Sequence, residues 1–205
     1  EGRLLVRQHG RTSRVCDISG IRIPGLHNLE NSLAAAAAAA AVGAPAAALA
    51  QALATFPGLP HRLELVGEIR GVRFVNDSKG TNVAAVLKSL EGYQGGVILI
   101  LGGKDKGGDF TPLAPLIRTR VRRLLLLGQA RKKISEQLAG VCPMEEVGSL
   151  EAAVARGLEL GEPGDSVLLS PACASFDMFR DFEHRGDVFR EAVRELRARV
   201  EAGRG

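Results

Sequence analysis

Aromatic residues are scarce in this chain of 205 residues, which has no tryptophan, one tyrosine and seven phenylalanines. Lysine is rare as well, because only six lysines stand among the 27 basic residues and arginine supplies the rest. The net charge is +4, and the basic residues are interleaved with acidic ones. Surfaces that bind nucleic acid usually concentrate basic charge and intersperse it with aromatic side chains. We therefore expect no nucleic-acid partner.

Cysteines and long apolar segments are also few. The three cysteines, Cys16, Cys142 and Cys173, are far apart and form no CxxC pattern, which argues against a disulfide framework or a zinc site. The longest apolar run, from Leu33 to Val42, is mostly alanine and is shorter than the roughly 20 residues that cross a bilayer. No charged-then-apolar leader opens the chain. These features predict a cytoplasmic protein that is not bound to a membrane.

The first quarter of the chain is predicted to hold too few elements for a complete core. Its apolar residues indicate strands at 4–7 and 15–23, and a close-packed, alanine-rich helix follows at 28–41. A second helix is expected at 46–55, where the sequence FPGLP then stops it. We expect residues 1–57 to be the remnant of a preceding α/β domain.

Residues 58–205 show a different pattern, in which apolar stretches alternate with helical ones. The stretches at 97–101, 124–127 and 167–169 are apolar throughout, as in strands that are buried on both faces of a parallel sheet. Further strands are expected at 63–69, 72–75 and near residue 144, and helices at 83–90, 113–119, 130–138, 150–160 and 176–200. The pattern predicts an α/β fold with a doubly wound, mostly parallel, Rossmann-like sheet.

Ligands of such sheets bind beyond the carboxyl ends of the strands, and three unusual loops follow predicted strands. Residues 76–82, NDSKGTN, gather more polar groups than a helix cap needs, although Ser78 or Thr81 alone would serve as a cap. Residues 102–109, GGKDKGGD, combine two lysines with backbone that can approach an anion, but they lack the P-loop spacing and also suit a solvated turn. Residues 170–176, SPACASF, lead into a predicted helix whose N-terminus would favour a carboxylate or phosphate.

The third loop also contains Cys173, for which two interpretations stay open. It could be a nucleophile or a reduced thiol without a catalytic role, and no histidine lies in a recognisable partner motif, since His184 is expected at the surface. Together the three loops offer lysines, hydroxyl donors and a helix start around one crevice. They predict a site for a small, multiply anionic ligand.

Five segments resemble the C-terminal portion of the Mur ligase family, and within it the branch that adds D-glutamate. They are HNLEN at 27–31, GLPHR at 58–62, NDSKGTN at 76–82, LGGKDKGGDF at 101–110 and LSPACASFDMFRDFEHRGDVF at 169–189. They occur in the family's order and cover nearly the whole chain. The long last segment, with NDSKGTN, distinguishes this branch from sister enzymes that add diamino acids or dipeptides.

The resemblance implies roles for particular residues. It implies ATP contacts for Asn28, Asn31, Arg62 and Asp77. It implies catalytic roles for Lys79 and Lys106, and a D-glutamate site lined by Lys79, Thr81, Lys106, Ser175, Phe176 and Phe182. The family often has leucine where this chain has Phe176, and it varies at Lys104, to which we ascribe only general positive potential. No metal ligand is expected in this chain.

The resemblance also implies a reaction. ATP, with Mg²⁺, phosphorylates the carboxylate of UDP-N-acetylmuramoyl-L-alanine, and the amino group of D-glutamate attacks the acyl phosphate. The P-loop, the metal ligands and the uridine-binding domain of this monomeric enzyme are not found in this sequence, so the chain by itself is expected to be inactive. The alternative is a stand-alone module that binds an anionic amino acid or a nucleotide.

Overall fold

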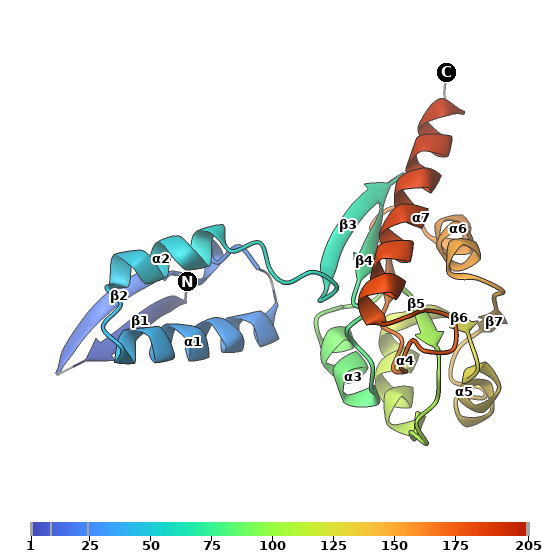
Figure 1. Ribbon diagram of the computed structural model, residues 1–205, viewed down its shortest axis with the longest axis horizontal. Helices are drawn as coiled ribbons and strands as arrows, with labels where there is room; N and C mark the ends of the chain where they lie inside the picture. The colour runs from blue at the N-terminus through green and yellow to red at the C-terminus, as the bar shows by residue number, and fades with distance from the viewer. Residues whose placement is uncertain (1, 9, 24, 204–205) are drawn as a thin grey trace. The chain divides into compact units, whose positions relative to one another are not determined.

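The computed structural model describes residues 2–8, 10–23 and 25–203 and divides into two compact units, with the boundary between Gly58 and Leu59. The two units are labelled by element in Figure 1 and are treated separately below. In the described ranges, no helix combines the length and the apolar character needed to pass through a membrane.

Unit 1 is a β-hairpin packed against two helices. Strands β1 (Arg3–Gln8) and β2 (Arg11–Asp17) pair in antiparallel fashion, and helices α1 (Leu26–Ala41) and α2 (Ala46–Thr55) follow. The small apolar core consists of Leu4, Val15, Ala36, Ala40 and Leu49. Only two alanines of the alanine-rich helix are therefore fully buried, so this helix packs along one narrow stripe.

The predicted strand at 15–23 is wrong at both ends. β2 starts at Arg11, because its register on β1 pairs Arg11 with Gln8 and Asp17 with Arg3. After Asp17 the backbone N–H of Ile18 still donates to the Gly2 carbonyl at 3.0 Å, and the chain then turns into a short 3₁₀ helix at Ile18–Gly20. A strand continues only where a neighbour supplies its hydrogen bonds, and the apolar pattern alone does not reveal where that neighbour ends.

Unit 2 contains a six-stranded, mostly parallel sheet, which confirms the predicted α/β fold class. The strand order is β3-β4-β8-β5-β6-β7, and only β3 is antiparallel to its neighbour. The strands are β3 (Glu64–Ile69), β4 (Val72–Asn76), β5 (Val97–Gly102), β6 (Val121–Leu127), β7 (Met144–Glu146) and β8 (Ser166–Leu169).

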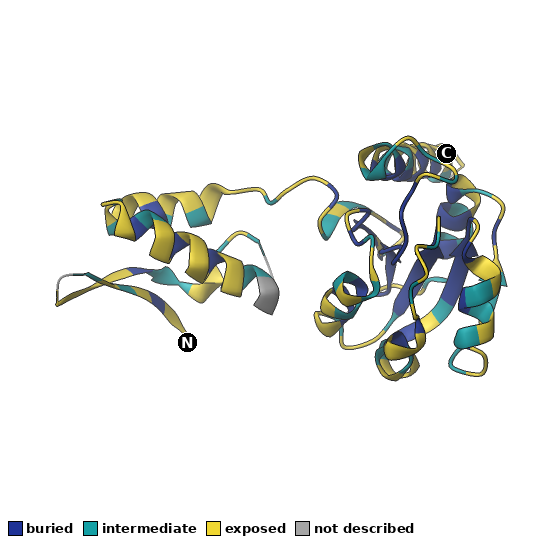
Figure 2. Ribbon diagram, turned by 60° about the horizontal axis from the view of Figure 1, so that its bottom comes forward, coloured by how far each residue is buried: buried dark blue, intermediate teal, exposed yellow. Residues whose placement is uncertain are grey.

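Helices cover both faces of this sheet, as the continuous apolar strands predict. They are α3 (Val83–Glu91), α4 (Ala114–Arg120), α5 (Arg131–Gln137), α6 (Leu150–Leu160) and α7 (Phe182–Ala202). Along β5, Val97, Leu99 and Leu101 pack with α3, α4 and α5, whereas Ile98 and Ile100 pack with α6 and α7. The central strands are accordingly buried throughout (Figure 2).

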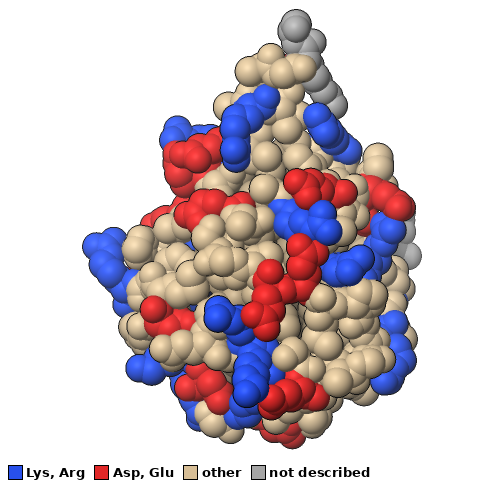
Figure 3. All heavy atoms as spheres, turned by 90° about the vertical axis from the view of Figure 1, so that its right-hand side faces the viewer, with Lys and Arg blue, Asp and Glu red and all other residues tan. Residues whose placement is uncertain are grey.

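The surface of unit 2 mixes charges of both signs. On the face seen in Figure 3, basic and acidic side chains alternate without a large patch of either. Several charged side chains of unit 2 form ion pairs, such as Arg156 with Glu145 at 2.9 Å and Arg122 with Glu162 at 2.8 Å. Exposed pairs of this kind contribute little to stability, about 0–1 kcal/mol each.

The predicted start of the last helix, at residue 176, is wrong. α7 begins at Phe182, where the side chain of Asp181 accepts a hydrogen bond from the backbone N–H of His184 at 2.6 Å. Residues 176–181 instead form turns, and the N–H groups of Met178 and Phe179 donate to the carbonyl of Ser175. A good N-cap thus sets the helix start, because its carboxylate accepts from an otherwise unpaired N–H.

Candidate anion-binding site

The three loops singled out from the sequence lie next to one another. They follow β4, β8 and β5, which are neighbours in the sheet and parallel, so their carboxyl ends share one edge. Backbone hydrogen bonds join the loops directly: Ala172 N–H donates to the Gly80 carbonyl and Lys104 N–H to the Ala174 carbonyl, both at 2.8 Å. The 170–176 loop lies in the middle and connects the other two.

In the 76–82 loop, Asp77 is an internal anchor. Its side chain is 6% exposed, and Oδ2 accepts hydrogen bonds from the hydroxyls of Ser89 at 2.6 Å and Ser170 at 2.7 Å. A Cβ atom at Gly80 would lie 2.8 Å from the same oxygen, so only glycine fits there. Asp77, which was expected to contact ATP, therefore points its carboxylate into the interior of the domain. The helix cap is Asn82, which accepts from Ala85 N–H, rather than Ser78 or Thr81.

Two predicted site residues from distant parts of the sequence meet at this edge. The ammonium nitrogen of Lys79 lies 3.8 Å from the ring centroid of Phe182, the first residue of α7. Lys79 is exposed and Phe182 is half-buried. A cation over an aromatic face is attracted by the ring quadrupole, which fixes the direction of the lysine side chain. Thr81, two residues further along the loop, is half-buried.

Sequence reasoning missed Arg185, which joins the first and third loops. Its guanidinium is 1% exposed and donates to the Ser78 hydroxyl at 2.9 Å, the Ser78 carbonyl at 2.8 Å and the Cys173 carbonyl at 3.1 Å. Burial lowers the pKa of Arg185 to about 10. The available signal was spacing: Arg185 lies three residues after Phe182 and four before Phe189, on the apolar side of its helix.

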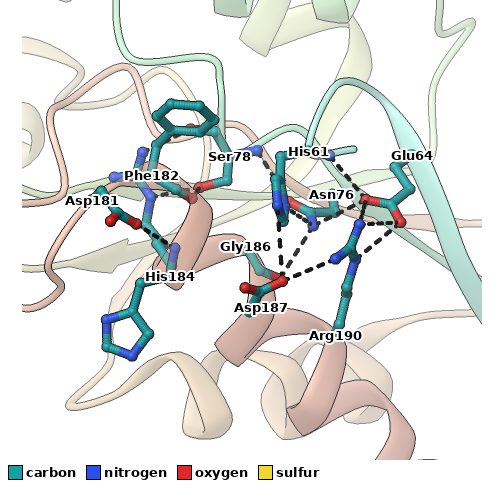
Figure 4. A network of polar contacts seen from close by, with 11 residues as sticks. His61, Glu64, Asn76, Ser78, Asp181, Phe182, His184, Gly186, Asp187 and Arg190 are labelled. Carbon is teal, nitrogen blue, oxygen red and sulfur yellow. Dashed lines mark hydrogen bonds and ion pairs between the residues drawn. The ribbon is translucent and has the colours of Figure 1, made fainter. Parts of the chain in front are cut away.

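A second network that sequence reasoning missed surrounds His61 (Figure 4). The ring of His61 is buried, and its Nδ1 lies 3.0 Å from the side-chain amide of Asn76, which also donates to the Gly186 carbonyl at 3.2 Å. Glu64 accepts from the backbone N–H of His61 at 2.9 Å and pairs with Arg190 at 2.8 Å. The network fixes the first residues of unit 2 onto β4 and α7.

Arg62, an expected ATP contact, is exposed and sits between two residues with unusual backbone angles. His61 and Leu63 have φ values of 61° and 44°, which non-glycine residues adopt only when the surroundings hold them there. Carboxylates hold both, since Glu64 accepts from His61 N–H and Asp77 Oδ1 accepts from Leu63 N–H at 3.4 Å. The position of Arg62 is thereby determined from both sides.

The third loop differs from expectation in its backbone. Because α7 begins at Phe182, no helix N-terminus stands directly behind residues 170–175, and that part of the prediction is wrong. Ser175 is 2% exposed, whereas Phe176 is 65% exposed at the surface. Cys173 is buried, and burial raises the pKa of its thiol to about 12. The structure thus argues against Cys173 as a nucleophile, since a nucleophile needs thiolate.

The remaining expected residues lie on the 102–109 loop and in unit 1. Lys106 is exposed on the 102–109 loop, as is Lys104. Asn28 is half-buried and Asn31 exposed near the start of α1, in unit 1. Among the residues that the structure describes, no three His, Cys, Asp or Glu side chains gather as ligands for a metal ion.

Unit 2 is an α/β domain whose mostly parallel sheet carries lysine-bearing loops at its carboxyl edge, and comparison with known proteins gives its family. Residues 61–173 match the family described as "Mur ligase, glutamate ligase domain". The chain belongs to the Mur ligase family, as its motifs indicate.

Two curated relatives of similar sequence are named for one reaction of this family. The chain is 45% identical over 201 residues to the UDP-N-acetylmuramoylalanine–D-glutamate ligase of Thermoanaerobacter sp. (strain X514) and 50% identical over 196 residues to that of Nitrosococcus oceani. These alignments cover 96% and 94% of the chain but only 44% and 42% of the relatives. The chain thus spans less than half the length of these two relatives.

Solved structures share the fold at low sequence identity. A pseudomurein peptide ligase type C from Methanothermus fervidus has a TM-score of 0.70 at 19% identity, over 95% of this chain and 40% of that protein. MurF ligase from Thermotoga maritima, solved in complex with ADP, has a TM-score of 0.61 at 16% identity, over 91% of this chain and 42% of that protein.

Proposed function

We propose that this chain is the C-terminal part of an ATP-dependent ligase that joins D-glutamate to UDP-N-acetylmuramoyl-L-alanine through an acyl phosphate, in peptidoglycan precursor synthesis in the cytoplasm. The observation that carries the proposal is the junction of the 76–82, 102–109 and 170–176 loops at one edge of the sheet. The 45–50% identity to ligases named for this reaction supports the choice of amino acid.

The loops suit an amino acid with two carboxylates. Lys79 and Lys106 bring cations from two loops, and charge-assisted hydrogen bonds from lysine to carboxylate are stronger than neutral ones. Thr81 and Ser175 add hydroxyl donors, and Phe176 and Phe182 would contact the carbon chain of D-glutamate. Holding the amine and neutralising its carboxylates would place the nucleophile for attack on the acyl phosphate, and such positioning supplies much of the rate in reactions of this kind.

We assign residues 1–57 to the end of an ATP-binding domain and residues 58–205 to the amino-acid-binding domain. Asn28 and Asn31 would contact ATP from the first, and Arg62 from the second. Asp77 would act on ATP mainly by fixing the loop, because its carboxylate already accepts two hydroxyl hydrogen bonds. Mg²⁺, held by residues outside this chain, would neutralise phosphate charge, and we expect a monomeric parent enzyme.

The competing hypothesis is a stand-alone module that binds an anionic amino acid or a nucleotide. A coupled phosphate-release assay separates the two. The ligase that carries this chain as its C-terminal part should release phosphate only with ATP, UDP-N-acetylmuramoyl-L-alanine and D-glutamate together, and the isolated chain should release none. Equal turnover with L-glutamate or meso-diaminopimelate would contradict the proposed specificity, and turnover by the chain alone would contradict its assignment as one part of the enzyme.

Lys106→Ala in that ligase tests the D-glutamate site. A lost charge-assisted bond of about 1.5–3 kcal/mol raises the apparent KM for D-glutamate by about 10- to 150-fold, with little change for ATP. Lys104→Ala is the matched control, because it removes the same charge from the same exposed loop. Equal rises in both KM values would place Lys106 at the nucleotide instead.

A further inference from the structure

The 102–109 loop is held at both ends and in its middle by α5 and the residue that precedes it. Ala130 N–H donates to the Gly103 carbonyl at 2.9 Å, and the Gln137 side chain accepts from Phe110 N–H at 2.8 Å. Between them, the ammonium of Lys133 donates to Asp105 Oδ2 at 2.8 Å. Of these three contacts, the one between Lys133 and Asp105 is an ion pair, and Asp105 directly precedes Lys106 in the chain.

The carboxylate of Asp105 accepts hydrogen bonds both from α5 and from its own loop. Oδ1 accepts hydrogen bonds from the backbone N–H groups of Gly107 and Gly108, both at 3.0 Å, while Oδ2 accepts one from the ammonium of Lys133. Along the chain, Lys106 lies between Asp105 and these two glycines, within the turn that their hydrogen bonds close, and its side chain is exposed. The hydrogen bond from Lys133 is the main cause that lowers the pKa of Asp105.

We propose that Lys133 is a positioning residue that sets the direction and the effective charge of Lys106 through Asp105. Without Lys133, Asp105 would be anchored only to its own loop, and the turn would move as a flexible glycine-rich segment. The same loss would leave an uncompensated carboxylate beside Lys106, which would attract that ammonium and repel an anionic ligand. Nothing in the sequence pattern marks Lys133, which is the third residue of the seven-residue helix α5.

The geometric part of this inference is independent of the ligand, whereas its consequence for D-glutamate rests on the proposed function. Lys133→Met removes the charge and keeps much of the apolar stem, and Lys133→Arg retains a donor to Asp105. Lys132→Met is the matched control, because Lys132 is an exposed neighbour on the same helix and makes the same change in net charge.

Amide hydrogen exchange of this chain, followed by NMR, tests the geometry. In Lys133→Met, the amides of Gly107 and Gly108 should exchange about two- to fivefold faster, the range expected for a half-exposed ion pair. Lys133→Arg should restore most of the protection, and Lys132→Met should leave it unchanged. Unchanged exchange in Lys133→Met would overturn the inference, whatever the enzyme does.

Steady-state kinetics of the ligase that carries this chain test the consequence. Lys133→Met should raise the KM for D-glutamate about two- to fivefold, with the KM for ATP unchanged and Lys133→Arg close to the parent. Faster exchange without any rise in this KM would also overturn the inference. Faster exchange in a parent enzyme that does not use D-glutamate would refute the proposed function and leave the effect of Lys133 on the loop established.

Discussion

Replacing Gly186 with alanine should destabilise unit 2 through the buried ring of His61. A Cβ atom at this position would lie 2.8 Å from Cε1 and from Cγ of that ring and closer still to Nδ1. The ring is 5% exposed and cannot move away without breaking its contact with Asn76. Overpacking of this kind costs about 1–3 kcal/mol, and the lost hydrogen bond about 1 kcal/mol.

One effect opposes this loss. Alanine is favoured over glycine in a helix interior by about 1 kcal/mol. The free energy of unfolding should therefore fall by about 1–3 kcal/mol, with steric overlap as the larger effect.

Urea unfolding followed by tyrosine fluorescence measures this change. The single tyrosine, Tyr93, packs against the core of unit 2 and so reports on that unit. Gly148→Ala is the control, because a Cβ atom there meets nothing within 4 Å, and its stability should stay within about 0.5 kcal/mol of the parent. If Gly186→Ala were as stable as the parent, or if both variants lost the same stability, the steric argument would be refuted.

Two further predictions concern ionisable groups whose pKa values burial raises. Burial raises the pKa of Tyr93 to about 12, so its absorbance titration should have a midpoint near that value in the folded chain and near 10 in urea. Since folding favours the neutral phenol, its contribution to stability is complete below about pH 10 and is lost as the pH rises toward 12; a folded midpoint near 10 would refute this. At pH 8, iodoacetamide should modify Cys173 much more slowly than Cys16 or Cys142, as peptide mass spectrometry would show, because Cys173 is buried and its pKa is raised to about 12. Preferential labelling of Cys173 in the folded chain would contradict this expectation, and all three thiols should react in urea.

Most elements of the chain could be predicted because their signals are local. The run 97–101 is apolar at every position, which a strand buried on both faces requires, and α2 begins and ends at the predicted residues, 46 and 55. The errors lie where a distant or competing hydrogen-bond partner decides where an element begins or ends. β2 ends at Asp17, which pairs with Arg3 at the start of β1, and α7 starts late because Asp181 caps it while the Ser175 carbonyl accepts the hydrogen bonds of the preceding turn.

At the carboxyl edge of the sheet, too, some features follow from the local sequence and others from contacts between distant residues. The sequence by itself determined which loops carry lysines, hydroxyls and glycines, because ligand-binding loops follow parallel strands and those residue types are visible in the printed chain. Only the tertiary structure decided which side chains face inward. It buried Asp77, placed Lys79 over Phe182, and inserted Arg185 between two loops. Lys133 likewise reaches Asp105 only because α5 packs beside the loop. Such contacts join residues far apart in the chain, and their geometry follows from strand order and helix packing, which local periodicity does not encode.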